Sequence, residues 1–214
     1  MKLTDFDYRL PDELIAQEPL AERSASRMLV VDRSSGTLQD RAFTELPAYL
    51  KPGDCLVLND SRVFPARLFG RREEYHRDVE IFLIEPASPD RKLWSALVRP
   101  GKKLPPGTSI RFSGSLTCDI LETGNGGERV VHFRTANNID DEIASVGHVP
   151  LPPYIHRKDN IADRERYQTV FAEIEGSAAA PTAGLHFTPE ALDACQRSGA
   201  EIARVTLHVG LGTF

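Results

Sequence analysis

The sequence predicts a mixed α/β main domain, of the α+β kind, into which a small six-stranded all-β barrel is inserted. Two observations lead to this fold class. Short apolar or alternating runs separated by turn residues fill the middle of the chain, which is typical of antiparallel β-structure. The flanks instead combine helix start signals with isolated strand patterns. We therefore expect residues 1–64 and 147–214 to form the main domain together, and residues 65–146 to form the barrel.

Before the predicted barrel, the pattern begins with a hairpin. The runs at residues 28–31 and 37–43 flank a Ser35-Gly36 turn. We expect Thr44 to cap a short helix that extends to Leu50, and we expect an apolar strand over residues 55–58.

Six strands are expected in the barrel, over residues 63–69, 79–84, 93–98, 109–112, 116–121 and 129–133. Proline and glycine clusters separate several of them, for example at residues 86–89 and 124–127. Short strands at such regular spacing favour a closed barrel, because closure removes exposed strand edges.

After the barrel, residues 140–146 have helical character and end at Gly147. The proline-rich run 150–153 cannot be helical and predicts an extended crossing. Helices are expected over residues 163–171 and from Pro189 to Gly199, where Thr188 is a good cap and proline suits the first helical position. The alternation in residues 201–209 predicts a final strand.

The composition is that of a globular protein. The chain has 214 residues, 41% of them hydrophobic, and a formal net charge of −5, which excludes nucleic-acid binding through bulk positive charge. Its three cysteines lie far apart without Cys-x-x-Cys spacing, so we expect a reduced, cytoplasmic protein without disulfides. Apolar runs are too short for a membrane segment.

Positive charge is concentrated in the predicted barrel. Residues 91–111 contain six basic and no acidic side chains, and Arg67, Arg71, Arg72 and Arg77 precede them. Such a face is either solvated surface or a phosphate-contacting surface. The charge pattern alone leaves both interpretations open.

The densest motif is Ala178-Ala179-Ala180-Pro181-Thr182-Ala183-Gly184-Leu185-His186-Phe187. Its small residues allow a ligand to approach the backbone, Gly184 permits an unusual φ, and a helix begins directly afterwards. His186 would project from a ligand-lined turn. A tight loop with a hydrogen-bonded histidine fits the same residues.

Two other motifs lie at strand ends. Thr206 and His208 precede a Gly210-Leu211-Gly212 loop, a weak match to a nucleotide-binding turn. Asp60 and Arg62 follow an apolar strand, where they could orient a ribose or phosphate. Cross-strand pairing and an ordinary polar turn are the alternatives.

Several catalytic motifs are missing from the sequence. It contains no Gly-x-Ser-x-Gly, no phosphate loop and no His-Glu-x-x-His, which disfavours hydrolase and kinase functions. His148 and His156 flank the proline-rich crossing without a ligand pattern around them, so no metal is expected.

Five segments in one order resemble the S-adenosylmethionine:tRNA ribosyltransferase-isomerase family of queuosine biosynthesis. They are residues 59–70, 147–154, 166–170, 179–187 and 206–214, and Ile15-Ala16-Gln17 near the N-terminus also fits. The resemblance implies an α/β domain with an inserted β-barrel. Because family members continue past the Gly-x-Gly-Thr-Phe segment, we expect this chain to correspond to an N-terminal portion of the enzyme.

The resemblance also implies a reaction. The ribosyl moiety of S-adenosylmethionine would be transferred and isomerised onto the aminomethyl group of 7-aminomethyl-7-deazaguanine in tRNA, which gives epoxyqueuosine, adenine and methionine. S-adenosylmethionine is then a co-substrate, no cofactor is expected, the partners are tRNA and S-adenosylmethionine, and the protein is expected to be a monomer.

Such chemistry requires a base beside the sulfonium, an acid for the departing adenine and donors to the ribose. On the resemblance, His186, Thr182 and His208 are expected to be catalytic. Substrate binding is expected from Asp60, Arg62, Arg67, Gly184, Gly210 and Gly212. A tRNA substrate favours a phosphate-binding face formed by Arg71, Arg72, Arg99, Lys102 and Lys103.

Two other functions fit the sequence. A tRNA methyltransferase that uses S-adenosylmethionine would take the Gly-x-Gly segment as its cofactor loop and would release S-adenosylhomocysteine. A truncated tRNA-binding module would bind tRNA in a salt-sensitive manner without turnover.

Overall fold

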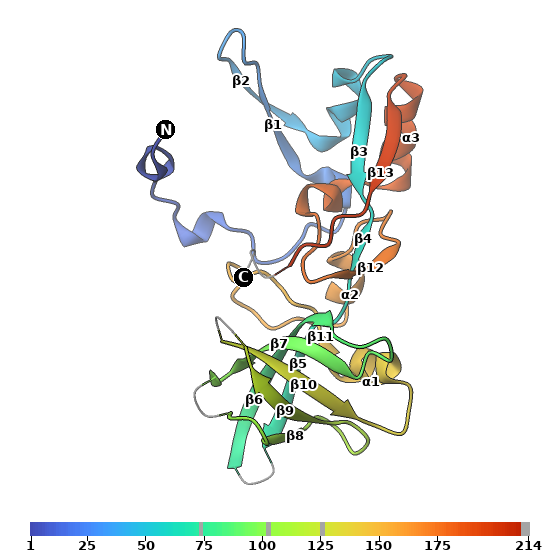
Figure 1. Ribbon diagram of the computed structural model, residues 1–214. Coiled ribbons are helices and arrows are strands. Elements are labelled where there is room, and N and C mark those ends of the chain that lie inside the picture. Colours follow the sequence, from blue (N-terminus) through green and yellow to red (C-terminus); the bar gives the residue numbers. More distant parts are fainter. Residues whose placement is uncertain (73–74, 102–103, 125–126, 211–214) are drawn as a thin grey trace.

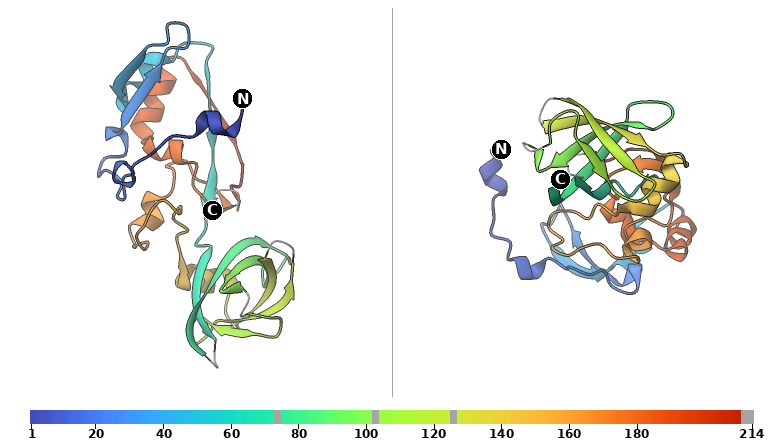
Figure 2. Two further views of the ribbon diagram at one scale, coloured as in Figure 1. Left: turned by 90° about the vertical axis from the view of Figure 1, so that its left-hand side faces the viewer. Right: turned by 90° about the horizontal axis from the view of Figure 1, so that it is seen from below.

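The computed structural model describes residues 1–72, 75–101, 104–124 and 127–210. Two bodies follow one another along its long dimension (Figures 1 and 2), a main domain that contains both chain ends of the described part and a barrel formed by the middle of the sequence. The chain passes into the barrel after β4 (Ser61–Val63) and returns through α1 (Ile139–Val146) and β11 (Gly147–His148). The boundaries at residues 64 and 146 remain predictions.

The predicted barrel is confirmed. Its described strands are β5 (Arg67–Arg72), β6 (Tyr75–Pro86), β7 (Leu93–Arg99), β8 (Ser109–Arg111), β9 (Thr117–Thr123) and β10 (Glu128–Arg134). They pair in the order β5-β6-β7-β10-β9-β8, all antiparallel, and β5 also pairs with β8, which closes the ring. Alternate residues point inward, so that Leu68, Ile81, Trp94 and Phe133 are almost completely buried.

Closure depends on a glycine in β5. A Cβ atom at Gly70 would lie 2.6 Å from Cγ2 of Ile110 and 2.9 Å from the carbonyl oxygen of Arg111. Both of these residues belong to β8. The missing side chain therefore allows the first and last strands of the ring to approach each other.

The expected strand over residues 63–69 is wrong in its extent, because the structure divides it into β4 and β5. Pro65 lies between them, and it has no N–H for a strand ladder. β4 belongs to the main domain, where it pairs in parallel with β12 (Ile174–Ser177). The proline therefore marks the transition between the two bodies.

The rest of the main domain combines a second parallel pair with a helix. β3 (Cys55–Asn59) pairs with β13 (Glu201–Val205), and α3 (Pro189–Arg197) precedes β13 in the chain. As predicted, the Thr188 hydroxyl caps α3 by accepting a hydrogen bond from the amide of Ala191 at 3.2 Å. Leu58, Phe171, Phe187 and Cys195 form the buried core around this helix.

The predicted hairpin is confirmed as β1 (Arg27–Val31) and β2 (Leu38–Ala42). The helix that follows is a 3-10 helix, η4 (Phe43–Tyr49), and Thr44 is not its cap. Instead the side chain of Glu45 accepts a hydrogen bond from the amide of Ala42 at 2.8 Å, so the helix begins earlier than expected.

Two expected elements are shorter than predicted. The helix expected over residues 163–171 is limited to α2 (Asp163–Arg166), because Gln168 forms two hydrogen bonds with the backbone of Val63, at 3.0 and 2.6 Å. The last strand ends at Val205 and does not extend to residue 209. The backbone amide of Leu207 donates to the side chain of Asn59 and therefore does not continue the strand pairing.

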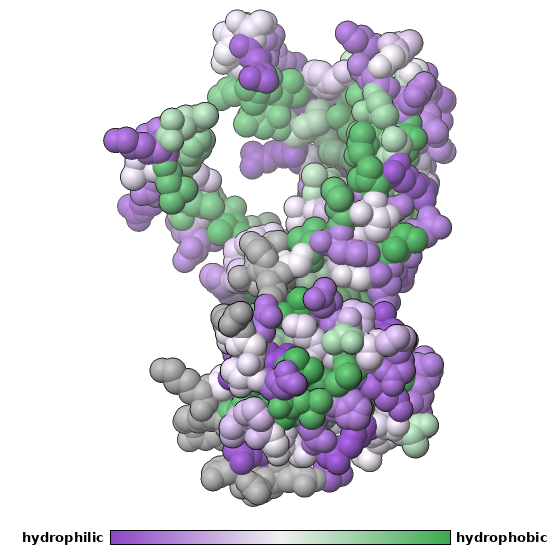
Figure 3. Space-filling model, in the orientation of Figure 1, coloured by the Kyte–Doolittle hydropathy of each residue, from purple (hydrophilic) through white to green (hydrophobic). Residues whose placement is uncertain are grey.

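Residues 1–26 form an extended N-terminal arm. It contains the 3-10 helices η1 (Leu3–Phe6), η2 (Asp12–Leu14) and η3 (Arg23–Ala25). The space-filling view shows apolar surface on the outer part of this arm and on the neighbouring hairpin (Figure 3). Within the described residues, no helix has the length and hydrophobicity needed to cross a bilayer.

Candidate functional site

A cavity of about 310 Å³ lies where the inner part of the N-terminal arm meets the main domain. We call it the arm cavity. Its apolar wall includes Pro19, Leu20, Leu151, Pro152, Ile155 and Leu185, and its polar groups include Tyr154, Tyr167, Thr182 and His186. An apolar wall with a few polar groups is typical of sites for small molecules.

Two arginines on the cavity wall hold the arm through backbone carbonyls. Arg23 donates to the carbonyl oxygens of Glu165 at 2.9 Å and Leu185 at 3.1 Å, and Arg166 donates to that of Leu20. Burial and the nearby charge of Arg166 lower the pKa of Arg23. The arm is therefore attached to both α2 and the segment that carries His186.

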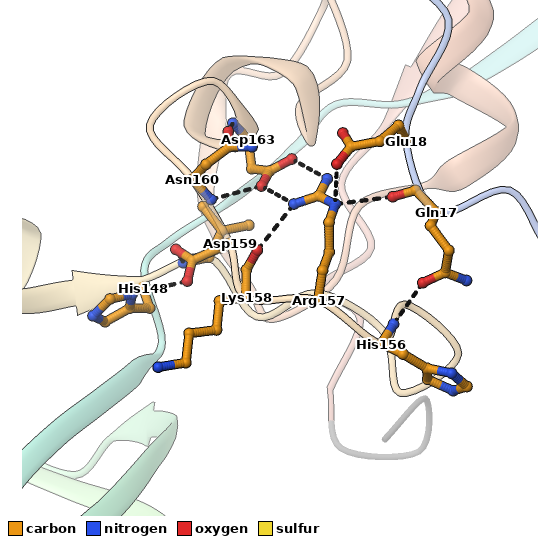
Figure 4. Close-up of polar contacts among 10 residues, drawn as sticks. Gln17, Glu18, His148, His156, Arg157, Lys158, Asp159, Asn160 and Asp163 are labelled. Atoms are coloured by element: carbon orange, nitrogen blue, oxygen red, sulfur yellow. Dashed lines mark hydrogen bonds and ion pairs between the residues drawn. The ribbon is translucent and has the colours of Figure 1, made fainter.

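A second attachment is centred on Arg157 (Figure 4). Its two terminal nitrogens donate to the carboxylate of Asp163 at 2.6 and 2.8 Å, and its Nε donates to the carbonyl of Gln17 at 2.9 Å. The hydrogen bonds to Asp163 raise the pKa of Arg157. The hydrogen bond from Arg157 also lowers the pKa of Asp163 despite burial, with help from the amide of Asn160. Both groups are therefore held in their charged forms.

The arm also contributes a side chain to this attachment. The Oε1 atom of Gln17 accepts from the amide of His156 at 2.7 Å (Figure 4). The Nε2 atom of Gln17 donates to the carbonyl of Tyr154 at 3.0 Å. His148 lies beyond, with its Nδ1 atom 2.8 Å from Asp159. These contacts order the proline-rich crossing beside the cavity.

His186 and Thr182 lie on one short element, η7 (Thr182–His186). Gly184 within it packs so closely that a Cβ atom would lie 2.9 Å from both Phe171 and Thr169. The ring of His186 is half-buried, with its centroid 5.5 Å from that of Phe43. Within the described residues its ring nitrogens make no hydrogen bond, and neither does the hydroxyl of Thr182. Both groups can therefore serve a ligand in the arm cavity.

Tyr167 is a cavity residue for which the sequence predicted no role. It lies within the Arg166–Val170 motif that carries the family resemblance, but the motif alone indicates no function for it. Tyr167 is only 8% exposed, yet its hydroxyl has no hydrogen-bond partner within the described residues. Burial raises the pKa of Tyr167 to about 12. The nearby backbone of Ala180 opposes this effect only in part, and it does not form a hydrogen bond with the hydroxyl.

A second cavity, of about 500 Å³, lies between the barrel and the main domain. We call it the junction cavity. It is lined by Phe64, Ile84, Glu85, Pro86, Arg91, Trp94, Glu175, Gly176, His208, Val209 and Gly210. The Arg91 guanidinium lies 5.0 Å from the centre of the Trp94 ring and pairs with Asp140 at 2.6 Å and Glu175 at 3.5 Å.

His208 lies against the backbone of Gly176 in this second cavity. A Cβ atom on Gly176 would approach the imidazole to 2.8 Å, and its φ of +148° favours glycine. Residues 176 and 182 are six apart in the sequence, so a fully extended chain would separate them by about 21 Å at most. The alanine-rich motif therefore connects the two cavities.

Asp60 is buried at the end of β3, where its Oδ1 atom accepts a hydrogen bond from the hydroxyl of Thr206 at 2.7 Å. The neighbouring Asn59 donates to the carbonyl of Leu207 at 2.9 Å. Arg62 is exposed on β4. The two residues expected to orient a ribose or phosphate thus point to different environments.

The structure places four of the predicted catalytic and binding residues in two groups. His186 and Thr182 share the arm cavity, whereas His208 and Gly210 line the junction cavity. Gly184 is buried in η7 and does not line either cavity. Gly212 lies outside the described residues. The catalytic and binding roles of all these residues remain predictions.

Three of the predicted tRNA-binding residues, Arg71, Arg72 and Arg99, lie on barrel strands. Arg71 pairs with Asp78 at 3.4 Å. Arg67, which was expected to bind substrate, lies on the same strand and pairs with Glu80 at 3.1 Å. Carboxylates therefore partly neutralise this face. Arg72 ends β5 and Arg99 is exposed at the end of β7. Lys102 and Lys103 lie outside the described residues. Contact with phosphate therefore remains a prediction for this surface.

Among the described residues, no group of three or more histidine, cysteine or acidic side chains is arranged to hold a metal ion. The three cysteines are unpaired, Cys55 at the surface and Cys118 and Cys195 in the interior.

A barrel inserted into an α/β domain, with the alanine-rich motif between two cavities, agrees with the architecture implied by the sequence motifs. Residues 3–214 match the family model described as queuosine biosynthesis protein. The chain therefore belongs to this family of queuosine biosynthesis proteins.

Relatives in this family carry the name S-adenosylmethionine:tRNA ribosyltransferase-isomerase. Those from Solibacter usitatus, Symbiobacterium thermophilum and Caldanaerobacter subterraneus are 56%, 51% and 46% identical to this chain over its whole length. The chain spans 65%, 62% and 62% of their respective lengths. A crystal structure of S-adenosylmethionine tRNA ribosyltransferase from Thermotoga maritima is 36% identical, with 96% of this chain and 58% of that chain covered and a TM-score of 0.38.

Proposed function

We propose that this chain carries the N-terminal part of an S-adenosylmethionine:tRNA ribosyltransferase-isomerase. The observation that supports this most strongly is that relatives of this name are 46–56% identical over all of its residues. Because the matches cover the whole chain, they extend over the alanine-rich motif that connects the two cavities.

In the proposed reaction, the ribosyl moiety of S-adenosylmethionine is transferred to the aminomethyl nitrogen of 7-aminomethyl-7-deazaguanine in tRNA and isomerised. The bonds from the ribosyl group to adenine and to the methionine sulfur break, while a carbon–nitrogen bond to the amine and a ring-closing carbon–carbon bond form. One proton leaves the carbon beside the sulfur and one leaves the amine; adenine takes up one of them and solvent the other. The products are epoxyqueuosine in tRNA, adenine and methionine. S-adenosylmethionine is a co-substrate in this scheme, and no resident cofactor or metal takes part.

His186 is the proposed acid or base, because its ring faces the arm cavity and its nitrogens are not engaged by the described residues. Thr182 lies on the same 3-10 helix and would hydrogen-bond the same ligand. His208 would act from the junction cavity on the acceptor nucleotide. Asp60 would bind the substrate through its carboxylate, whose Oδ1 atom is already oriented by Thr206.

We further propose that a monomeric, cytoplasmic protein binds tRNA phosphates with the barrel. Arg99 is an exposed cation on this surface, and Arg71 would exchange its exposed partner Asp78 for a phosphate. Because counterions are released on binding, affinity for tRNA should fall steeply as salt increases.

The test is a comparison of two proteins. The 214-residue chain and a chimera extended with the C-terminal remainder of the Solibacter usitatus relative are each incubated with S-adenosylmethionine and tRNA that contains 7-aminomethyl-7-deazaguanine. Digested nucleosides are analysed by mass spectrometry, and free adenine is measured. We expect at least the extended chimera to form epoxyqueuosine, together with an equal amount of free adenine.

Other products would refute the proposal. S-adenosylhomocysteine and a methylated nucleoside would indicate a methyltransferase, and tight tRNA binding by both proteins without turnover would indicate a binding module. In the active protein, His186→Ala should lower kcat about 100-fold or more if the imidazole transfers a proton. His132→Ala, on barrel strand β10, is the matched control and should retain activity.

A further inference from the structure

The arm cavity holds three hydrogen-bonding side chains that the described residues leave unused. They are the hydroxyl groups of Tyr167 and Thr182 and the imidazole of His186. A buried hydroxyl without a partner destabilises a folded protein, and such groups are rare in native structures. Among the five buried side-chain atoms that have no partner within the described residues, the Tyr167 hydroxyl is the one that belongs to a residue lining the arm cavity. It is therefore the candidate partner for a ligand bound there.

The Tyr167 side chain is held firmly for this purpose. Its ring packs in the cluster of Val63, Val149, Leu151 and Ala180. Its hydroxyl keeps its proton at neutral pH, as an ordinary tyrosine with a pKa of about 10 does, and burial raises this pKa further, to about 12. It is therefore a hydrogen-bond donor that needs an acceptor atom.

The charges around the cavity favour a ligand portion that is not anionic. Three acidic and three basic side chains lie on the wall and balance one another, namely Glu18, Glu22, Asp163, Arg23, Arg157 and Arg166. Arg157 is paired with two of these carboxylates, and Arg23 and Arg166 are bonded to backbone carbonyls. Each of the three guanidinium groups therefore already makes a contact within the protein, and the wall as a whole carries no excess positive charge.

Size and chemistry together point to a purine nucleoside. A volume of about 310 Å³ lies at the small end of ligand pockets. Purine ring nitrogens and ribose oxygens are acceptors for the Tyr167 and Thr182 hydroxyls, and the apolar wall from Leu151, Ile155 and Leu185 suits a flat heterocycle.

We propose that the arm cavity binds the nucleoside part of S-adenosylmethionine, with Tyr167 and Thr182 as hydrogen-bonding residues and the N-terminal arm as one wall of the site. This inference rests on the proposed function, since that function supplies the ligand. Because arm residues such as Gln17 and Arg23 line the cavity, a ligand bound there contacts the arm. Binding and arm position are therefore coupled.

The test measures binding to the 214-residue chain by equilibrium dialysis, with S-adenosylmethionine, adenosine and the free base 7-aminomethyl-7-deazaguanine as separate probes. Tyr167→Phe and Thr182→Val each remove one hydroxyl and keep the side-chain shape. Each should weaken binding of S-adenosylmethionine and of adenosine about tenfold, the effect of losing one good hydrogen bond.

Thr169→Val is the matched control. Its hydroxyl is also buried and unpartnered, but it does not line the arm cavity, so affinity should stay unchanged. Hydrogen exchange of residues 15–26 should slow when S-adenosylmethionine binds, because the bound ligand holds the arm in place.

Several results would overturn the inference. They are no binding of S-adenosylmethionine to the wild-type chain, equal affinity in all three variants, or binding of the free base in preference to adenosine. Normal KM for S-adenosylmethionine in a catalytically active Tyr167→Phe chimera would also overturn it while leaving the proposed function intact. Binding that depends on Tyr167, in a protein that never forms epoxyqueuosine, would support this site and reject the proposed function.

Discussion

Replacing Asp163 by Asn should release the N-terminal arm. The carboxylate accepts from both terminal nitrogens of Arg157, at 2.6 and 2.8 Å, and from the amide of Asn160 at 2.8 Å. The side chain of Asp163 is 5% exposed and that of Arg157 20% exposed. The isosteric amide in Asp163→Asn would turn an N–H group toward the guanidinium of Arg157. The positive charge of Arg157 would then have no carboxylate at this contact.

The expected cost is about 3 kcal/mol, which is the lower end of the range for breaking a buried ion pair. The lower end applies because Arg157 keeps its contacts with Glu18 and with the carbonyl of Gln17. A loss of about 3 kcal/mol corresponds to a roughly 150-fold larger equilibrium constant for local opening of the arm. The arm and the crossing segment should open together, because Gln17 bonds to the amide of His156.

Amide hydrogen exchange followed by mass spectrometry measures this opening directly. Peptides that contain residues 15–20 and 155–163 should exchange much faster in Asp163→Asn. The single tryptophan, Trp94, lies in the barrel core, so the midpoint of unfolding followed by tryptophan fluorescence should not change.

Glu173→Gln is the control, because it removes a carboxylate from an exposed pair with Arg204 whose side chains are 65% and 51% exposed. Exposed ion pairs contribute little, typically less than about 1 kcal/mol. Exchange in Asp163→Asn that is no faster than in Glu173→Gln would refute the argument that the pair with Arg157 anchors the arm.

Three further predictions concern other parts of the molecule. Gly176→Ala should displace the His208 ring, since the new Cβ would lie 2.8 Å from it, and should lower the free energy of unfolding by about 1–3 kcal/mol through backbone strain. The imidazole resonances of His208 measure the displacement, and calorimetry measures the loss of stability. Gly210→Ala is the control and should change neither, because a Cβ at Gly210 meets open space. Because the folded chain lowers the pKa of Asp163, its stabilising effect is complete above the ordinary carboxyl pKa of about 3.9 and is lost as pH falls through the lower folded value. Between pH 6 and pH 2, the calorimetric midpoint should therefore fall further in the wild type than in Asp163→Asn. Iodoacetamide should modify the exposed Cys55 and spare Cys118, because burial raises the pKa of the Cys118 thiol; peptide mass spectrometry reads this out, and rapid modification of Cys118 in the folded protein would contradict its burial.

The barrel was predictable because its information is local. Each strand carries its own alternation of inward and outward residues, and turn residues separate the strands. The helix α3 was predictable for the same reason, since Thr188 and Pro189 specify its start within a few residues. Errors arose where distant residues compete for the backbone. Gln168 ends α2 early by bonding to Val63, which lies 105 residues away.

The candidate site was predictable only in part. His186 and Thr182 belong to one compact motif, so the sequence placed them together. Tyr167 was missed because nothing in its neighbourhood indicates that its hydroxyl would be buried without a partner. The arm was expected to belong to the main domain, but its place as a cavity wall depends on contacts such as that of Gln17 with His156, 139 residues apart.

The sequence by itself determined the family, the inserted barrel and the residues with reactive chemistry, because motifs, alternation and caps act over short distances along the chain. Only the tertiary structure decided which of those residues share a site. It brings the arm, α2 and η7 around one cavity that contains His186, and it places His208 against Gly176 in another. The physical reason is that packing joins residues more than one hundred positions apart, and spacing along the chain does not specify such contacts.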